Sequence, residues 1–215
     1  MLLCSWLAYS KCLHILKQFS FVLFFFLNNK GVAKPIGCPV GSYSAAEGLQ
    51  AEYQCLNCTG GEFCNSTGKT TTSGPCEPGY FCPQGSTSPR EVVCSVGHYC
   101  LQGTFHPYQC PKGTYSNGTG LTDNTNCTPC REGWYCDDTG LTEPKAECDP
   151  GFYCPTGQNR SNPYQCPAGM HCPRGSPSSK SCPAGTFVDY PQASQCHSCP
   201  AGYYCVPELV TPGEN

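Results

Sequence analysis

Twenty of the chain's cysteines follow a fixed spacing. From Cys38 the steps in sequence number to each next cysteine are 17, 3, 6, 12, 6, 12, 6 and 10, which leads to Cys110. The same eight steps lead from Cys110 to Cys182, so the sequence has a 72-residue period. A third round, with steps of 14, 3 and 6, reaches Cys205. Such self-similarity predicts an array of small repeated units. It also predicts that the third unit is truncated and the sequence a fragment.

A shorter, 18-residue period lies inside each unit, because six-residue steps between two cysteines recur in the form Cys-x-x-Gly-x-aromatic-Cys, with small variations. Glycine stands three places after cysteine in ten such openings, at positions 41, 61, 79, 97, 113, 133, 151, 169, 185 and 202. A glycine at a fixed offset predicts a tight turn that needs positive φ. The aromatic residues after it are expected to lie across a disulfide and replace an aliphatic core.

Aliphatic residues are too scarce to build a conventional core. Residues 34–215 hold 19 Leu, Ile, Val and Phe residues among 182, about 10%. Burial of so little apolar surface cannot offset the loss of chain entropy on folding. The composition therefore excludes an ordinary globular enzyme domain and favours a disulfide scaffold in an oxidising compartment. We expect no catalytic site, no cofactor and no metal.

The predicted fold class is a small disulfide-rich fold of elongated tandem repeats. Gly, Pro, Ser, Thr and Asn separate the cysteines, and no window has sustained 3.6-residue apolar spacing. Short β-hairpins and turns are therefore expected, with little or no helix outside the N-terminal segment. The predicted divisions are a leader at 1–33, repeat units at 34–109 and 110–181, and a truncated unit at 182–215.

The N-terminal segment, residues 1–33, differs in composition from the rest. Lys11 and Lys17 precede the apolar run 19–27, and small residues follow at 31–33. A run of nine residues is typical of a signal peptide and is shorter than the ~20 needed to span a bilayer. We therefore predict cleavage after Ala33. The alternatives are an uncleaved anchor, which would attach the chain to a membrane, and a wrongly assigned first exon.

Net charge argues against a nucleic-acid partner, and the sequence offers sequons for glycosylation if the chain is secreted. Residues 34–215 hold 9 basic and 15 acidic residues, a net charge of −6, with no basic stripe. The five Asn-x-Ser/Thr acceptors are Asn57, Asn65, Asn117, Asn126 and Asn159. Asn65, Asn117 and Asn159 lie in loops and are the preferred glycosylation sites. Asn57 and Asn126 precede cysteines, where rapid disulfide formation would compete with modification.

Other candidate sites have structural explanations that we prefer. The three Cys-x-x-Cys pairs, which begin at Cys55, Cys127 and Cys196, could bind zinc or act in redox exchange in a reducing compartment. His98 and His171 occupy aromatic positions of the repeat, where packing is expected. The carboxylates Asp137, Asp138 and Asp149 lack the spacing of a calcium loop. The aromatic pairs Trp134–Tyr135 and Tyr203–Tyr204 could be exposed for binding, but packing on disulfides is favoured.

The opening Cys-Pro-Lys-Gly-Thr-Tyr-Ser at 110–116 and the Cys-x-x-Cys-x-x-Gly-aromatic-aromatic-Cys that follows resemble the ephrin-receptor-like cysteine-rich repeats of extracellular mosaic proteins. The resemblance covers about residues 38–205. It implies an extracellular, elongated, non-catalytic module. The extra six-residue steps at 76–82, 94–100, 148–154 and 166–172 depart from the simplest repeat of that family, so its bonding pattern does not transfer directly.

Two disulfide schemes respect the period. In the first, each opening pair closes on itself (Cys38–Cys55, Cys110–Cys127, Cys182–Cys196) and each six-residue step is bridged locally. In the second, which resembles tumour-necrosis-factor-receptor modules, Cys58–Cys76 and Cys64–Cys82 interleave. We favour the first, because it treats all 18-residue segments alike. The expected half-cystines are Cys38, Cys55, Cys58, Cys64, Cys76, Cys82, Cys94, Cys100, Cys110, Cys127, Cys130, Cys136, Cys148, Cys154, Cys166, Cys172, Cys182, Cys196, Cys199 and Cys205.

The leading functional hypothesis is a non-catalytic structural or interaction segment of a larger secreted or cell-surface protein, with an unidentified extracellular protein or matrix partner. The alternative is a secreted cysteine-rich inhibitor or defence-type effector that acts through one exposed loop. The mild variation of the loops within a duplicated plan favours the first hypothesis.

Overall fold

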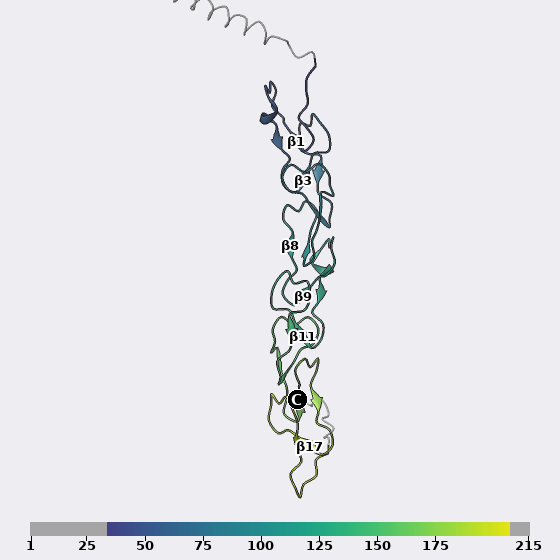
Figure 1. Ribbon diagram of the computed structural model, residues 1–215, viewed down its shortest axis with the longest axis vertical. Coiled ribbons are helices and arrows are strands. Elements are labelled where there is room, and N and C mark those ends of the chain that lie inside the picture. Colours follow the sequence, from purple (N-terminus) through teal and green to yellow (C-terminus); the bar gives the residue numbers. More distant parts are fainter. Residues whose placement is uncertain (1–33, 207–215) are drawn as a thin grey trace, which may run out of the picture. The chain divides into compact units, whose positions relative to one another are not determined.

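The computed structural model describes residues 34–206 (Figure 1). The chain divides into two units, Met1–Gly37 and Cys38–Asn215. The predicted leader at 1–33 lies outside the described residues. All the repeats belong to the second unit, which is described here.

Nine antiparallel hairpins make up the described secondary structure, each a sheet of two strands. We number them 1 to 9 in chain order, from β1–β2 to β17–β18. The strands are β1 (Ser42–Tyr43), β2 (Leu56–Asn57), β3 (Glu62–Phe63), β4 (Gly74–Pro75), β5 (Tyr80–Phe81), β6 (Val92–Val93), β7 (His98–Tyr99), β8 (Tyr108–Gln109), β9 (Thr114–Tyr115), β10 (Thr128–Pro129), β11 (Trp134–Tyr135), β12 (Ala146–Glu147), β13 (Phe152–Tyr153), β14 (Tyr164–Gln165), β15 (Met170–His171), β16 (Lys180–Ser181), β17 (Thr186–Phe187) and β18 (His197–Ser198). Figure 1 shows the labelled strands of this unit in sequence order.

Helix is limited to two 3-10 turns among residues 34–206. They are η2 (Glu52–Gln54) and η3 (Asn124–Asn126), and each lies in the long loop that opens a 72-residue unit. The corresponding loop from Cys182 to Cys196 is three residues shorter and has no such turn. The prediction of short hairpins with little helix is therefore confirmed.

Each hairpin begins with the predicted tight turn. In hairpin 1 the backbone N–H of Ser42 donates to the carbonyl of Pro39 at 3.1 Å, and Gly41 stands at the third position of the turn. The ten glycines that follow cysteine by three residues all have positive φ, between 73° and 86°. This conformation costs an L-residue with a Cβ about 1–2 kcal/mol, which explains the fixed offset of glycine.

The twenty cysteines form ten disulfides that follow the first scheme, with Cα–Cα separations of 5.8–6.2 Å. The pairs are Cys38–Cys55, Cys58–Cys64, Cys76–Cys82, Cys94–Cys100, Cys110–Cys127, Cys130–Cys136, Cys148–Cys154, Cys166–Cys172, Cys182–Cys196 and Cys199–Cys205. Apart from cysteines, the buried hydrophobic residues of the described chain are Val188 and Ala193. Sulfur thus takes the place of an aliphatic core.

Backbone hydrogen bonds connect each hairpin to the next in two directions. The turn glycine donates its N–H to a carbonyl one hairpin ahead, at 2.8–3.1 Å, in the pairs Gly41–Cys64, Gly61–Cys82, Gly79–Cys100, Gly97–Ser116, Gly113–Cys136, Gly133–Cys154, Gly151–Cys172 and Gly169–Val188. In hairpin 9, Gly185 donates in the same way to Cys205, which follows the last described hairpin. A loop residue donates back to the first cysteine of the preceding hairpin, at 2.7–3.0 Å, in the pairs Gly68–Cys38, Gly85–Cys58, Gly103–Cys76, Gly120–Cys94, Gly140–Cys110, Gly157–Cys130, Gly175–Cys148 and Gln192–Cys166.

These links continue across the boundaries of the 72-residue units. Gly97 reaches Ser116 across the first boundary, and Gly169 reaches Val188 across the second. The 72-residue period therefore describes the sequence, whereas the repeating structural element is the single hairpin with its disulfide.

Candidate functional site

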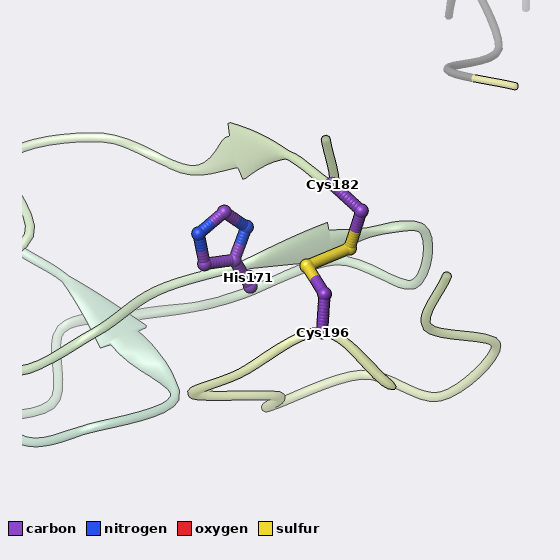
Figure 2. A group of neighbouring side chains, drawn as sticks. All are labelled: His171, Cys182 and Cys196. Carbon is purple, nitrogen blue, oxygen red and sulfur yellow. A yellow bond between two sulfur atoms is a disulfide. The ribbon is translucent and has the colours of Figure 1, made fainter. Parts of the chain in front are cut away.

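A histidine and a disulfide lie together between hairpins 8 and 9 (Figure 2). His171 belongs to β15, and a ring nitrogen and the sulfurs of Cys182 and Cys196 all lie within 4.8 Å of one another. The aromatic position of one hairpin thus faces the disulfide of the next hairpin here. Within residues 34–206, this is the one group of three or more His, Cys, Asp or Glu residues close enough to hold a metal ion.

The chemistry of this group depends on the state of its sulfurs. Cys182 and Cys196 are joined in a disulfide, which leaves neither as the thiolate that binds metal. The Nδ1 atom of His171 is buried and has no hydrogen-bond partner. In the oxidised chain the imidazole therefore packs, as predicted for His171, but retains an unpaired polar atom, which is uncommon in folded proteins.

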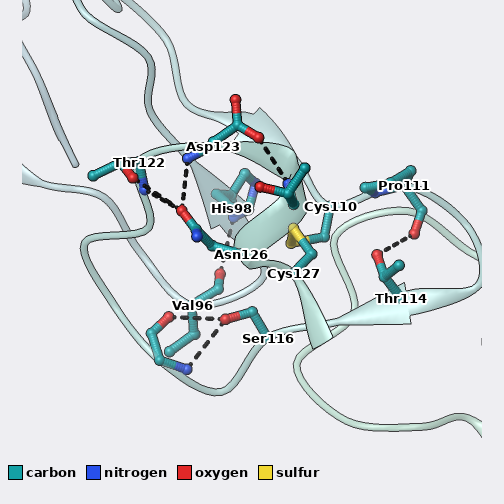
Figure 3. The surroundings of a disulfide bond; sticks show 12 residues. Val96, His98, Cys110, Pro111, Thr114, Ser116, Thr122, Asp123, Asn126 and Cys127 are labelled. Carbon is teal, nitrogen blue, oxygen red and sulfur yellow. Dashed lines mark hydrogen bonds between the residues drawn. A yellow bond between two sulfur atoms is a disulfide. The ribbon is translucent and has the colours of Figure 1, made fainter. Parts of the chain in front are cut away.

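His98 has a different environment, beside the Cys110–Cys127 disulfide (Figure 3). Its Nδ1 lies 2.9 Å from the carbonyl oxygen of Val96, to which it donates when that nitrogen carries the proton. This hydrogen bond within the turn agrees with a structural role.

Hydrogen bonds of polar side chains stabilise the loop that the Cys110–Cys127 disulfide closes. The side-chain oxygen of Asn126 accepts the backbone N–H of Asp123 at 3.0 Å and the hydroxyl of Thr122 at 2.9 Å. Asp123 in turn accepts the N–H of Thr125 at 2.9 Å, and this hydrogen bond lowers the pKa of the Asp123 carboxyl. These contacts cap η3 and need no ligand to satisfy them (Figure 3).

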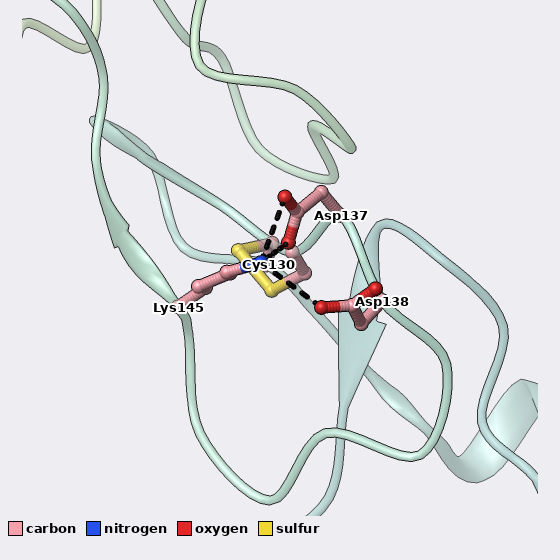
Figure 4. A network of polar contacts seen from close by, with 5 residues as sticks. Cys130, Asp137, Asp138 and Lys145 are labelled. Atoms are coloured by element: carbon pink, nitrogen blue, oxygen red, sulfur yellow. Dashed lines mark hydrogen bonds and ion pairs between the residues drawn. A yellow bond between two sulfur atoms is a disulfide. The ribbon is translucent and has the colours of Figure 1, made fainter.

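The acidic pair considered for calcium is held by a lysine (Figure 4). Lys145 Nζ lies 2.9 Å from Asp137 and 3.0 Å from Asp138. Hydrogen bonds to Asp137 and then to Asp138 raise the pKa of Lys145, and the Lys145 hydrogen bond lowers the pKa of Asp138. Asp149, the third candidate, accepts the hydroxyl of Ser161 at 2.6 Å. The three carboxylates therefore have partners within the fold.

The aromatic candidates fall into two groups. Trp134 and Tyr135 are half-buried, and the guanidinium of Arg131 lies 4.0 Å from the Trp134 ring centroid. Tyr203 and Tyr204 are 77% and 89% exposed among the described residues. Packing thus accounts for the first pair, whereas the second pair lies open at the last described disulfide.

All five sequon asparagines are exposed: Asn57, Asn65, Asn117, Asn126 and Asn159. Asn65 accepts a hydrogen bond from the Ser73 hydroxyl at 2.9 Å, and Asn126 is engaged in the η3 cap. An Asn side chain keeps its carbonyl oxygen as an acceptor when a glycan is attached to nitrogen. Glycosylation of the expected sites remains a prediction.

Sequence reasoning missed an exposed apolar surface on hairpin 1. Tyr53 is 86% and Leu56 is 57% exposed. The equivalent positions in the second unit are Thr125 and Thr128, which are also exposed. A comparison of equivalent positions between the units would have found this departure, because the two units share a backbone plan and the first carries apolar groups where the second carries threonine.

Comparison with protein-family models finds no match to this chain, and comparison with curated proteins finds none either. The resemblance to ephrin-receptor-like repeats therefore stays a prediction. No helix within residues 34–206 is long and apolar enough to cross a membrane. Ten disulfides in paired short hairpins identify a cysteine-rich module and are consistent with an extracellular location.

Proposed function

We propose that this chain is a non-catalytic spacer and interaction segment of an extracellular protein, and that its hairpins form an elongated array. The observation that carries the proposal is the bidirectional hydrogen bonding between successive hairpins, which recurs from hairpin 1 to hairpin 9. In an array connected in this way each hairpin is held against the next, so the array can act as a spacer between whatever lies at its two ends.

Disulfides suit this role better than they suit catalysis. Each hairpin or opening loop is closed by its own disulfide, so the covalent closure of one hairpin does not depend on another. An aliphatic core would need more apolar residues than the chain supplies. The same reasoning supports a secreted or cell-surface setting, in which disulfides persist.

The ephrin-receptor-like resemblance supports the same proposal. Repeats of that kind stand beside adhesion and recognition modules in mosaic proteins. The exposed Tyr53 and Leu56 of hairpin 1 line the same surface hollow and are the residues at which we would look first for contact with an extracellular protein or matrix partner, since contiguous apolar surface marks interaction sites.

Small-angle X-ray scattering of the secreted, oxidised chain tests the proposal. A compact domain of this size has a radius of gyration of about 16 Å. We expect a value well above that, with a pair-distance distribution skewed to long distances. A value near the compact figure would contradict the array.

A further inference from the structure

The disulfide beside His171 differs from most others in its access to solvent. Cys196 is partly exposed, whereas both sulfurs of the six local bridges between Cys58 and Cys172 belong to cysteines that are 0% exposed. Thiol–disulfide exchange requires a thiolate to reach one sulfur in line. An external dithiol therefore reaches Cys182–Cys196 more readily than these six bridges.

We propose that reduction of Cys182–Cys196 by a dithiol creates a zinc site whose ligands are Cys182, Cys196 and His171. In the exchange, two thiols of the reductant become a disulfide and Cys182 and Cys196 each become a thiol. Each thiol then loses its proton when it binds Zn²⁺ as a thiolate. The disulfide and the metal are thus alternative links between the same two sulfurs.

The positions of the donor atoms around His171 favour replacement of the disulfide by a bound zinc ion. All three donor atoms lie within 4.8 Å of one another. Zinc bonds of about 2.3 Å to sulfur and about 2.0 Å to nitrogen place such donors roughly 3.5–4 Å apart, so shifts of about 1 Å complete the set. The buried Nδ1 of His171 has no other partner. The ligands fix three positions of a tetrahedron and leave the fourth to water.

Zinc would also preserve the fold that reduction weakens. The Cys182–Cys196 bridge closes a loop with a sequence separation of 14, and Val188 and Ala193 of that loop pack around Cys182. A metal ion bound by both sulfurs closes the same loop, so the packed cluster survives the loss of the covalent bond.

The chain contains a matched control in the preceding 72-residue unit. Tyr99 stands at the position equivalent to His171, and Cys110–Cys127 is the equivalent disulfide. A phenol in place of the imidazole removes the nitrogen ligand. The variant His171→Tyr therefore reproduces a side chain that the repeat already accommodates.

The first test is mapping of free thiols on the full oxidised chain. The protein is treated with increasing dithiol, with and without Zn²⁺, and free cysteines are alkylated and located by mass spectrometry. We expect Cys182 and Cys196 to be alkylated before the six buried bridges, and Zn²⁺ to protect both. Reduction that opens those bridges first, or alkylation that Zn²⁺ does not slow, overturns the proposal.

The second test separates metal binding from simple opening of the loop. Co²⁺ added to the partially reduced chain should give one thiolate charge-transfer band per chain. His171→Tyr and His171→Phe should weaken Co²⁺ binding by more than about tenfold. Tyr99→His should add a second site once Cys110–Cys127 is opened. Equal Co²⁺ affinity in the wild type and both His171 variants would rule out the imidazole as a ligand.

Discussion

Gly41 packs against the carbonyl oxygen of Gly85, two hairpins further along the chain. A Cβ built on Gly41 would lie 2.5 Å from that oxygen, closer than real Cβ atoms approach. The same relationship recurs at Gly79 with Gly120 and at Gly113 with Gly157, at 2.6 Å in both cases. Turn glycines are therefore needed for two reasons, positive φ and the approach of a distant carbonyl.

Alanine substitution at two glycines distinguishes the cost of positive φ from the cost of a clash with a distant carbonyl. Gly151 and Gly157 have φ of 83° and 82°, but a Cβ on Gly151 would clash with the Gln192 carbonyl, whereas one on Gly157 meets nothing within 4 Å. Gly157→Ala should cost about 1–2 kcal/mol for its backbone conformation. Gly151→Ala should cost about 1–3 kcal/mol more, because it also overpacks the contact.

Denaturant midpoints and secreted yields of the two variants provide the measurement. Both variants add one methyl group at nearly the same φ, so the difference between them isolates the effect of the contact with the Gln192 carbonyl. Equal loss at both positions would mean that the conformation of the turn, and not the contact between alternate hairpins, selects glycine.

At Gln192 the reverse substitution, from a residue with a side chain to glycine, can be tested. It is the one non-glycine residue with positive φ within 34–206, at 63°, and it stands where the other hairpins have glycine. Its N–H donates to the Cys166 carbonyl at 2.8 Å, a contact that does not involve the side chain. Gln192→Gly should therefore stabilise the chain by up to about 1 kcal/mol, because it removes backbone strain. The check is a higher urea midpoint; Gln195→Gly, a nearby exposed substitution, serves as the control and should give no such rise.

Much of the fold could be predicted from the sequence because its determinants are local. A six-residue step between cysteines confines both ends of the turn, and Gly79, for example, supplies the positive φ that this turn requires. Local closure of each loop follows from the same short spacing. Paired cysteines are separated in sequence by 6, 14 or 17, so each bridge is local, as in the scheme that we favoured among the two that the spacing left open.

Contacts between hairpins could not be predicted in this way. Seven of the eight loop donors are glycines and the eighth is Gln192, and each of them donates its backbone N–H to a backbone carbonyl. Backbone groups carry these bonds, and sequence patterns say little about backbone partners. The contact between Gly41 and Gly85 is hidden for the same reason, since the group that approaches Gly41 is a carbonyl oxygen.

The candidate sites also contain contacts between segments that the sequence could not predict. Pairing of Asp137 with Lys145 depends on two strands that lie side by side, and no local motif predicts it. The equivalent positions in the first unit are Asn65 and Ser73, which are also hydrogen bonded to each other. Two chemically different pairs thus occupy one structural position.

Titration of the Asp138 carboxyl should detect its ion pair with Lys145. The Lys145 hydrogen bond lowers the folded-state pKa of Asp138, so the pair stabilises the fold above the unfolded pKa. That contribution is lost as the pH falls through the folded pKa. Carbon-detected NMR of the Asp138 carboxyl should give a midpoint below the usual value of about 3.9. In Lys145→Gln the midpoint should rise toward that value.

Asp123 is the internal control for this titration. Its pKa is lowered by the Thr125 hydrogen bonds and does not depend on Lys145. Its midpoint should stay unchanged in Lys145→Gln. Because the Lys145 pair is exposed, we expect only a slight change in the unfolding midpoint at neutral pH. An Asp138 midpoint that does not move would mean that the ion pair is not maintained in solution.

Glycosylation should follow the placement of the sequons. Asn65, Asn117 and Asn159 lie in exposed loop segments outside the strands, whereas the sequons of Asn57, which ends β2, and of Asn126, which caps η3, each contain a half-cystine. Oligosaccharide transfer needs an accessible acceptor, and early closure of a disulfide restricts one. Asn65→Gln, Asn117→Gln and Asn159→Gln should each remove one glycan from the secreted chain, seen as a mobility step that N-glycosidase abolishes. Asn57→Gln and Asn126→Gln should leave the mobility almost unchanged. A secreted chain whose mobility N-glycosidase does not alter would contradict glycosylation at the preferred sites.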